Sequence, residues 1–282
     1  MWFVALVFAA TMAIGAQTVW WSWHPAHEVD GHATWDLLYV VVSYAGRFAV
    51  VRWFLVLGAA LVSLAAIGIV LQRAWGFLLA LPCSASLIAV ALLARYVAIF
   101  EEPPQFVARS HYVQDATAIA LATVASHGAS IILGVRLLCR KPVRLALARL
   151  VLGALAAMIA GVPGIWMYEH LPGGTRNAMM VCACAAVAVA ALIACCLPKR
   201  VTVLATMGVS LTALVVLAVG LVLHLHDRPR RGDLYSEAAE LAICQIAVTA
   251  PLVVALVGVC IVLRCHLAAA PNHEASEQRS PA

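Results

Sequence analysis

Charged residues are scarce in this chain. Of its 282 residues only 11% are charged, while 65% are hydrophobic. In a soluble domain about a quarter of the residues are charged, so the composition excludes a soluble globular protein and indicates an integral membrane protein. The formal net charge of +5 does not indicate a nucleic-acid partner, because the basic residues lie in short loops between apolar runs, where they act as topology signals.

The sequence also lacks the motifs of common metalloenzymes and nucleotide-binding proteins. It contains no HExxH, no paired CxxC and no phosphate-binding loop, and no nucleophile stands beside an evident base. Catalysis is therefore not expected, although polytopic enzymes can use clusters of histidine and aspartate. The absence of a repeat of fixed period argues against a transporter built from two related halves.

The chain has instead a series of apolar runs of about 20 residues, the length that crosses a hydrocarbon core as a helix. They predict an all-α, polytopic membrane helix bundle in a single domain, residues 1–267, followed by a disordered tail, residues 268–282. Residues 22–52 are expected to form an outer loop, with Leu37–Val51 as an interfacial helix because Arg47 interrupts its apolar sequence. The eight runs are Trp2–Trp21, Trp53–Leu71, Phe77–Phe100, Val113–Leu138, Leu145–Tyr168, Ala178–Leu197, Val201–His224 and Ala238–Leu263.

The loop charges predict how the bundle is oriented. If the amino terminus lies inside, the dense basic segment "RLLCRKPVRLALAR", residues 136–149, falls in an inner loop. Lys and Arg concentrate in cytoplasmic loops, and the other basic residues are more evenly divided between the two sides. This segment therefore decides the orientation, and both termini are expected in the cytoplasm.

Acidic residues and histidines are divided between the two expected sides of the membrane more unequally than the basic residues are. In this orientation all 13 acidic residues other than Glu274 and Glu277 lie in outer loops or at outer helix ends. The same holds for all ten histidines other than His127, His266 and His273. None of the nine cysteines lies in an outer loop, so a disulfide framework is not expected.

The densest part of the expected outer face is "WWSWHPAHEVDGHATWD", Trp20–Asp36. Imidazole is the commonest protein ligand of metals such as copper and zinc, and a carboxylate can orient it from behind. A helical turn would put His24 and His27 on one side together with Glu28. The same residues also suit a polar and aromatic membrane interface that binds nothing. The first candidates for a metal site are His24, His27, His32 and His111, and the secondary candidates are His170, His224, His226, Glu28 and Asp115.

One histidine is expected inside the membrane. His127 follows Thr123 by four residues and precedes Ser130 by three, so the three share one face of the fourth run. Polar side chains are costly in a bilayer, so this stripe must face the bundle. It predicts either a hydrogen-bonded seam between helices or a site for haem ligation or proton relay.

Two other ionisable residues lie at or near the membrane. Arg95 is expected to extend outward and pair with Glu101 and Glu102. Glu240 stands near the outer start of the last run, where a carboxylate is favoured by the helix dipole. Both have an ordinary structural explanation, and both could also line a path for a solute.

Three segments after residue 109 share an order of features with a known family: "SHYVQDATAIALATVASHGASIILGVRLL", "GVPGIWMYEHLPGGTRNAMM" and "DLYSEAAELAICQIAVTAPLVV". They resemble the outer His-x-x-Gln-His helix entrance, the Pro-and-Tyr turn and the start of the final span of the CtaG-type cytochrome c oxidase assembly factors. His111 and Gln114 match the first motif, and Asp115 stands where the family has its second histidine. Pro163 fits the second motif, whereas Ala239-Glu240 replaces the Asp-Gln pair of the third.

The resemblance implies a polytopic protein of a bacterial inner membrane that is associated with copper supply to the oxidase. Its expected partners are the lipid bilayer and an oxidase subunit or another membrane complex. The leading hypothesis is therefore an accessory protein that binds copper at the outer histidines. Because a copper(I) site normally uses Met or Cys, which the outer loops lack, copper(II) or zinc is favoured.

Three other functions stay open. The first is a transporter or channel for a small solute, with a path past Arg95, His127 and Glu240. The second is a haem-binding subunit in which His127 and an outer histidine face one cavity. The third is a structural subunit of a membrane complex, in which no single histidine matters.

Overall fold

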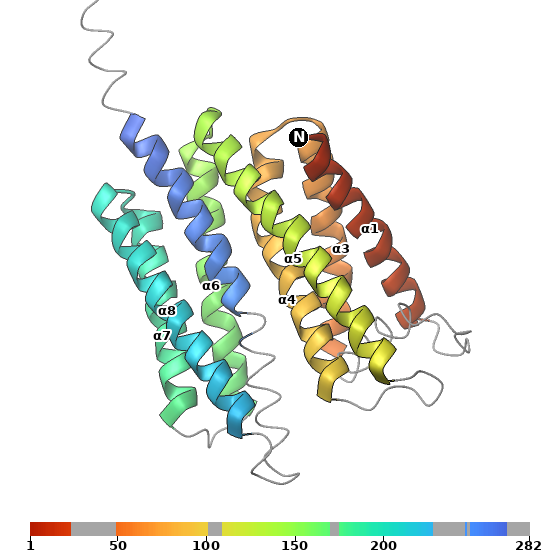
Figure 1. Ribbon diagram of the computed structural model, residues 1–282. Helices are drawn as coiled ribbons and strands as arrows, with labels where there is room; N and C mark the ends of the chain where they lie inside the picture. Colours follow the sequence, from red (N-terminus) through yellow and green to blue (C-terminus); the bar gives the residue numbers. More distant parts are fainter. Residues whose placement is uncertain (24–48, 101–108, 170–174, 228–245, 247–248, 270–282) are drawn as a thin grey trace, which may run out of the picture. The chain divides into compact units, whose positions relative to one another are not determined.

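The computed structural model describes residues 1–23, 49–100, 109–169, 175–227, 246 and 249–269 (Figure 1). These residues are almost entirely α-helical, and no strand occurs among them, which confirms the predicted all-α fold. In chain order the helices are α1 (Trp2–Trp23), α3 (Ala49–Val70), α4 (Ala74–Phe100), α5 (Arg109–Arg140), α6 (Leu145–Glu169), α7 (Thr175–Cys196), α8 (Arg200–Asp227) and a C-terminal helix, Thr249–Ala269.

Each predicted apolar run overlaps one of these helices. α6 differs from its predicted run by a single residue at its end. α3 begins at Ala49, before the predicted start at Trp53, so the end of the expected interfacial segment belongs to α3. The C-terminal helix continues to Ala269, two residues into the predicted tail. The rest of both segments lies outside the described residues.

Length and hydropathy make this a multi-pass membrane protein. Large apolar side chains on several helices are exposed, among them Leu6, Leu121 and Val201. Water would disfavour so much apolar surface, whereas lipid chains accept it. Three shorter apolar stretches lie within α1, α3 and α6: Trp2–Ala13, Gly58–Val70 and Leu145–Gly161. The described part of the chain has five helices long and apolar enough to cross a membrane: Ala74–Leu92, Ala116–Arg140, Ala178–Cys196, Arg200–His226 and Thr249–Ala269.

The chain forms two compact units, Met1–Gly134 and Val135–Ala282. In the first unit α3 packs against both α1 and α4. In the second unit α7 packs against both α6 and α8. The boundary between the units falls within α5, so one continuous helix contributes to both. The expectation of a single domain stays a prediction.

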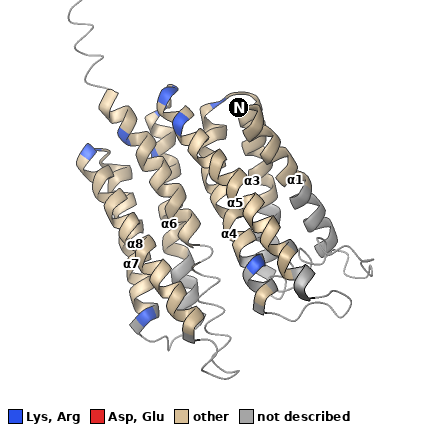
Figure 2. Ribbon diagram, in the orientation of Figure 1, with Lys and Arg blue, Asp and Glu red and all other residues tan. Residues whose placement is uncertain are grey.

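Basic residues gather at one end of the second unit (Figure 2). This end includes the last residues of α5, the start of α6 and the short connection between α7 and α8. At the same end the Arg149 Nε donates to the Cys195 carbonyl at 2.7 Å, which ties α6 to α7. Arg176 lies at the start of α7 and hence at the opposite end. The basic end contains the segment 136–149, whose inner position stays a prediction.

The turn between α3 and α4 lets the two helices approach closely. The Gln72 amide donates to the Ile69 carbonyl and the Arg73 amide to the Gly68 carbonyl, both at 2.9 Å, the two bonds of a Schellman motif. Gln72 takes the left-handed conformation, with φ 56°. A Cβ on Gly68 would lie 2.5 Å from the Cα of Gly76. Only the absence of a side chain at both glycines allows the backbones to pack this tightly.

Replacing Gly68 by alanine should therefore destabilise the first unit. The added methyl group forces α3 and α4 apart, at a cost of about 1–3 kcal/mol typical of overpacking. The measurement is thermal unfolding of the detergent-solubilised protein, monitored by circular dichroism. Gly58→Ala in the same helix is the matched control, because a Cβ there would meet nothing within 4 Å. Equal unfolding temperatures for Gly68→Ala and the wild-type protein would contradict the close approach.

Candidate functional site

Most of the predicted metal ligands lie outside the described residues. These are His24, His27, His32, His170 and Glu28. Glu240, expected near the outer start of the last run, also lies outside the described residues. His111 and Asp115 belong to the first turns of α5, but their side chains are not among those described. The outer histidine site therefore stays a prediction.

His224 and His226 lie in the last turn of α8. The side chain of His224 is half-buried and that of His226 is exposed. Two residues apart on a helix, their side chains point to different faces. Within the described part of the chain, no group of three or more His, Cys, Asp or Glu residues is placed to hold a metal ion.

The described polar centre of the first unit is His127, which is only 2% exposed. Its Nε2 lies 3.0 Å from the hydroxyl of Thr11 in α1. Its Nδ1 lies 3.1 Å from the hydroxyl of Ser84 in α4. The ring of Phe8 meets the imidazole edge to face, with centroids 5.5 Å apart. We call Thr11, Ser84 and His127 the histidine node. It joins α1, α4 and α5.

Hydrogen bonding within the histidine node determines the tautomer of His127. The Thr11 hydroxyl donates its proton to the Val7 carbonyl at 2.8 Å, so its oxygen accepts from the Nε2–H of His127. A neutral imidazole then carries its lone pair on Nδ1, and the Ser84 hydroxyl donates to it. Both ring nitrogens of His127 and the hydroxyls of Thr11 and Ser84 thus all take part in hydrogen bonds, as polar groups in a bilayer require.

This geometry favours the hydrogen-bonded seam over the functional alternatives for His127. With both ring nitrogens engaged, neither is available to bind a haem iron in this arrangement. A side chain that is 2% exposed does not line an open solute path. Ser130 of the same stripe is bonded locally, since its buried hydroxyl donates to the Ser126 carbonyl one turn earlier at 2.9 Å.

Arg95 has a partner that the sequence did not indicate. Its side chain is exposed, and its Nε donates to the Thr117 hydroxyl of α5 at 3.2 Å. Thr117 in turn donates to the Val113 carbonyl at 2.7 Å. The expected partners Glu101 and Glu102 lie outside the described residues. Arg95 therefore contributes a second polar link between α4 and α5.

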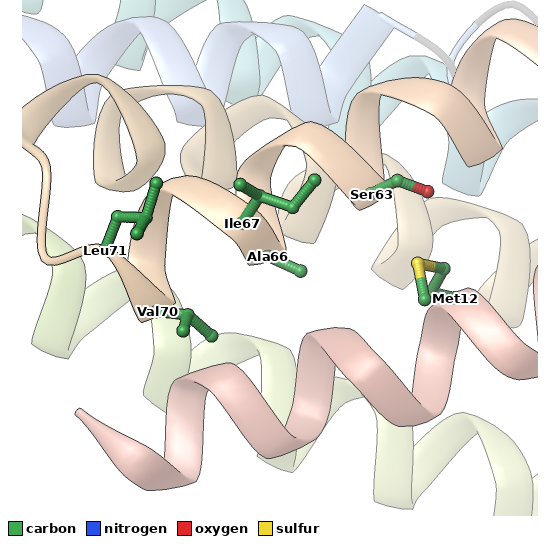
Figure 3. Close-up of a pocket in the computed structure, with 6 residues that line it drawn as sticks. All are labelled: Met12, Ser63, Ala66, Ile67, Val70 and Leu71. Atoms are coloured by element: carbon green, nitrogen blue, oxygen red, sulfur yellow. The ribbon is translucent and has the colours of Figure 1, made fainter.

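A shallow hollow lies between α1 and α3 (Figure 3). Its volume is about 300 Å³, and its lining is almost wholly apolar. It includes neither His127 nor Arg95, so it offers no path past these residues. An apolar hollow in a membrane helix pair is suited to lipid chains. The lining residues are Met12, Ser63, Ala66, Ile67, Val70 and Leu71.

Sequence reasoning identified His127 but missed Thr11 and Ser84. Each is a single small hydroxyl residue within an apolar run, where such residues are common and usually bond their own helix. Ser63, for example, donates only to the Ala59 carbonyl at 2.7 Å. The sequence carries no signal that separates these two kinds of hydroxyl.

Comparison of the chain with models of known protein families, with curated proteins and with solved structures finds no match.

Replacing Ser84 by alanine should destabilise the protein, because the buried Nδ1 of His127 loses its donor. The expected loss is about 0.6–1.7 kcal/mol, from the average to the maximum measured for hydrogen bonds between membrane helices. Thermal unfolding in detergent measures it. Ser126→Ala is the matched control and should change little, because that hydroxyl donates only within α5, to the Ala122 carbonyl at 2.7 Å and the Thr123 carbonyl at 3.3 Å. Equal losses in both variants would show that the bond between helices adds nothing.

Proposed function

We propose that this multi-pass membrane protein is an accessory protein of a respiratory chain that binds copper on its outer face during cytochrome c oxidase assembly. The observation that carries the proposal is the concentration of histidines and carboxylates in Trp20–Asp36, between tryptophans suited to a membrane interface. The resemblance of residues 110–265 to CtaG-type assembly factors supports the choice of copper. The protein binds and passes on the metal rather than catalysing a reaction.

The first unit supplies a framework that fits this proposal. α1 and α5 run in opposite directions (Figure 1), and the histidine node joins them. Trp23, the last residue of α1, lies twelve residues beyond Thr11, and His111 lies sixteen residues before His127. With a rise of about 1.5 Å per residue, these positions are ~18 Å and ~24 Å from the shared hydrogen bond.

The last residue of α1 and the first turn of α5 thus lie at the same end of the unit, at similar distances from the shared hydrogen bond. His24 follows Trp23 directly, and His111 is two residues from the start of α5. A site that draws ligands from both segments therefore needs no long-range movement of the helices. Nitrogen and oxygen donors of this kind suit copper(II) or zinc.

Metal content tests the proposal. The detergent-purified protein, with its accessible cysteines alkylated so that thiols neither bind nor reduce the metal, is offered copper(II), desalted and analysed by elemental mass spectrometry. The wild-type protein should retain near-stoichiometric copper. A variant with His24, His27 and His32 all changed to alanine should lose it, because the main imidazole ligands are gone.

The control is His273→Ala, which removes a histidine from the expected inner face only. This control should keep its copper, and all variants must show the unfolding temperature of a folded protein. Folded wild-type protein that retains neither copper nor zinc would refute the proposed metal handling. If the folded protein retained zinc but not copper, zinc would be identified as the metal that it binds.

A further inference from the structure

Two cysteines from distant parts of the chain meet at the basic end of the second unit. The thiols of Cys139, near the end of α5, and Cys265, in the C-terminal helix, are close enough to share a hydrogen bond. Neither forms a disulfide. We call these two residues the thiol pair.

A second contact one residue away holds the same helices together. The Nε2 of His266 lies 3.0 Å from the carbonyl oxygen of Leu138. A carbonyl oxygen can only accept, so Nε2 carries the proton and donates it. The hydrogen bond orients His266 and fixes the helices beside the thiol pair. His266 is therefore a positioning residue for the two cysteines.

The thiol pair is accessible, unlike the cysteines of the core. Cys139 and Cys265 are both partly exposed, whereas Cys184 and Cys260 are 0% exposed. Arg140 and Arg264 directly adjoin the two cysteines in sequence, and both are exposed. The pair thus lies near the ends of both helices, beside basic residues whose positive charge favours an anionic group.

The number of available ligands indicates which metal the thiol pair can bind. Thiolates are soft ligands that prefer copper(I), zinc or iron–sulfur clusters. Structural zinc needs four protein ligands, and the described residues contain no group of even three suitable side chains. Copper(I), with a filled d shell, is stable between two thiolates alone. The expected inner face is also reducing, which keeps thiols free and favours metal binding over a disulfide.

We propose that Cys139 and Cys265 form a two-thiolate binding site for copper(I). Binding converts Cu⁺ and two Cys–SH groups into a [Cu(S–Cys)₂]⁻ unit and two protons, with no change of oxidation state. Arg140 and Arg264, the sequence neighbours of the two cysteines, supply positive charge in the region of the single negative charge of the product. The site shares no ligand with the proposed outer histidine site, so an experiment can refute one site without refuting the other.

Competition with the copper(I) chelator bicinchoninate tests the site. Reduced full-length protein in detergent is titrated with copper(I) without oxygen, in the background in which His24, His27 and His32 are alanine. One copper should bind tightly, with release of two protons, because each thiol must lose its proton. Cys139→Ser and Cys265→Ser should each weaken binding by more than about 100-fold, the upper range for loss of a merely supporting contact.

Cys196→Ser is the matched control, because Cys196 is exposed and lies at the same end of the unit. It should bind copper(I) like the parent protein. His266→Ala should weaken binding by about 10–100-fold, as loss of a positioning contact does. Unchanged affinity in both Cys139→Ser and Cys265→Ser would overturn the proposal.

A second measurement uses the unaltered protein, so it does not depend on whether a variant folds. Copper(I) should protect Cys139 and Cys265 together from alkylation by N-ethylmaleimide, while Cys196 continues to react. Mass spectrometry of the digested protein reports each cysteine separately. Alkylation of the thiol pair at the same rate with and without copper(I) would refute the site.

Discussion

A membrane interior offers no water to a polar group, so every polar side chain there must find its partner within the protein. This constraint explains most of the few polar residues of the described helices, with the buried hydroxyl of Ser210 as an exception. Most hydroxyls, such as that of Ser63, bond a carbonyl one turn earlier in their own helix. His127 cannot be satisfied in this way, because its two ring nitrogens need one donor and one acceptor. Thr11 and Ser84 supply them from two other helices. The satisfaction of one imidazole therefore ties α1, α4 and α5 together.

The histidine node also links the membrane scaffold to the proposed function. α1 leads directly into the segment that contains His24, and α5 begins two residues before His111. Hydrogen bonds that join α1 and α5 midway fix how far each helix extends on either side, because an α-helix has a constant rise per residue. The hydrogen bonds of one buried residue thus set the relative positions of the helix ends from which these segments continue. This role accounts for a histidine in the membrane without assigning it any chemistry of its own.

The two faces of the protein carry different donor atoms. The expected outer face is rich in imidazole and carboxylate and has no cysteine in its loops. The basic end of the second unit carries the thiol pair, Cys139 and Cys265. Hard and borderline donors suit copper(II) or zinc, and soft donors suit copper(I). The proposed sites therefore match the redox conditions expected on the two sides, with the reduced metal on the side where thiols stay reduced.

The sequence by itself determined that the chain is a membrane bundle and where nearly every helix lies, because an apolar run long enough to cross a bilayer is a local signal. It also marked His127 as a residue that must face another helix. Only the tertiary structure decided that Thr11 and Ser84 are its partners, and that Cys139 meets Cys265. Such pairings depend on the rotation of each helix about its axis and on its depth beside its neighbours. Packing between residues far apart in the chain sets both quantities, as the contact of Thr11 with His127 illustrates.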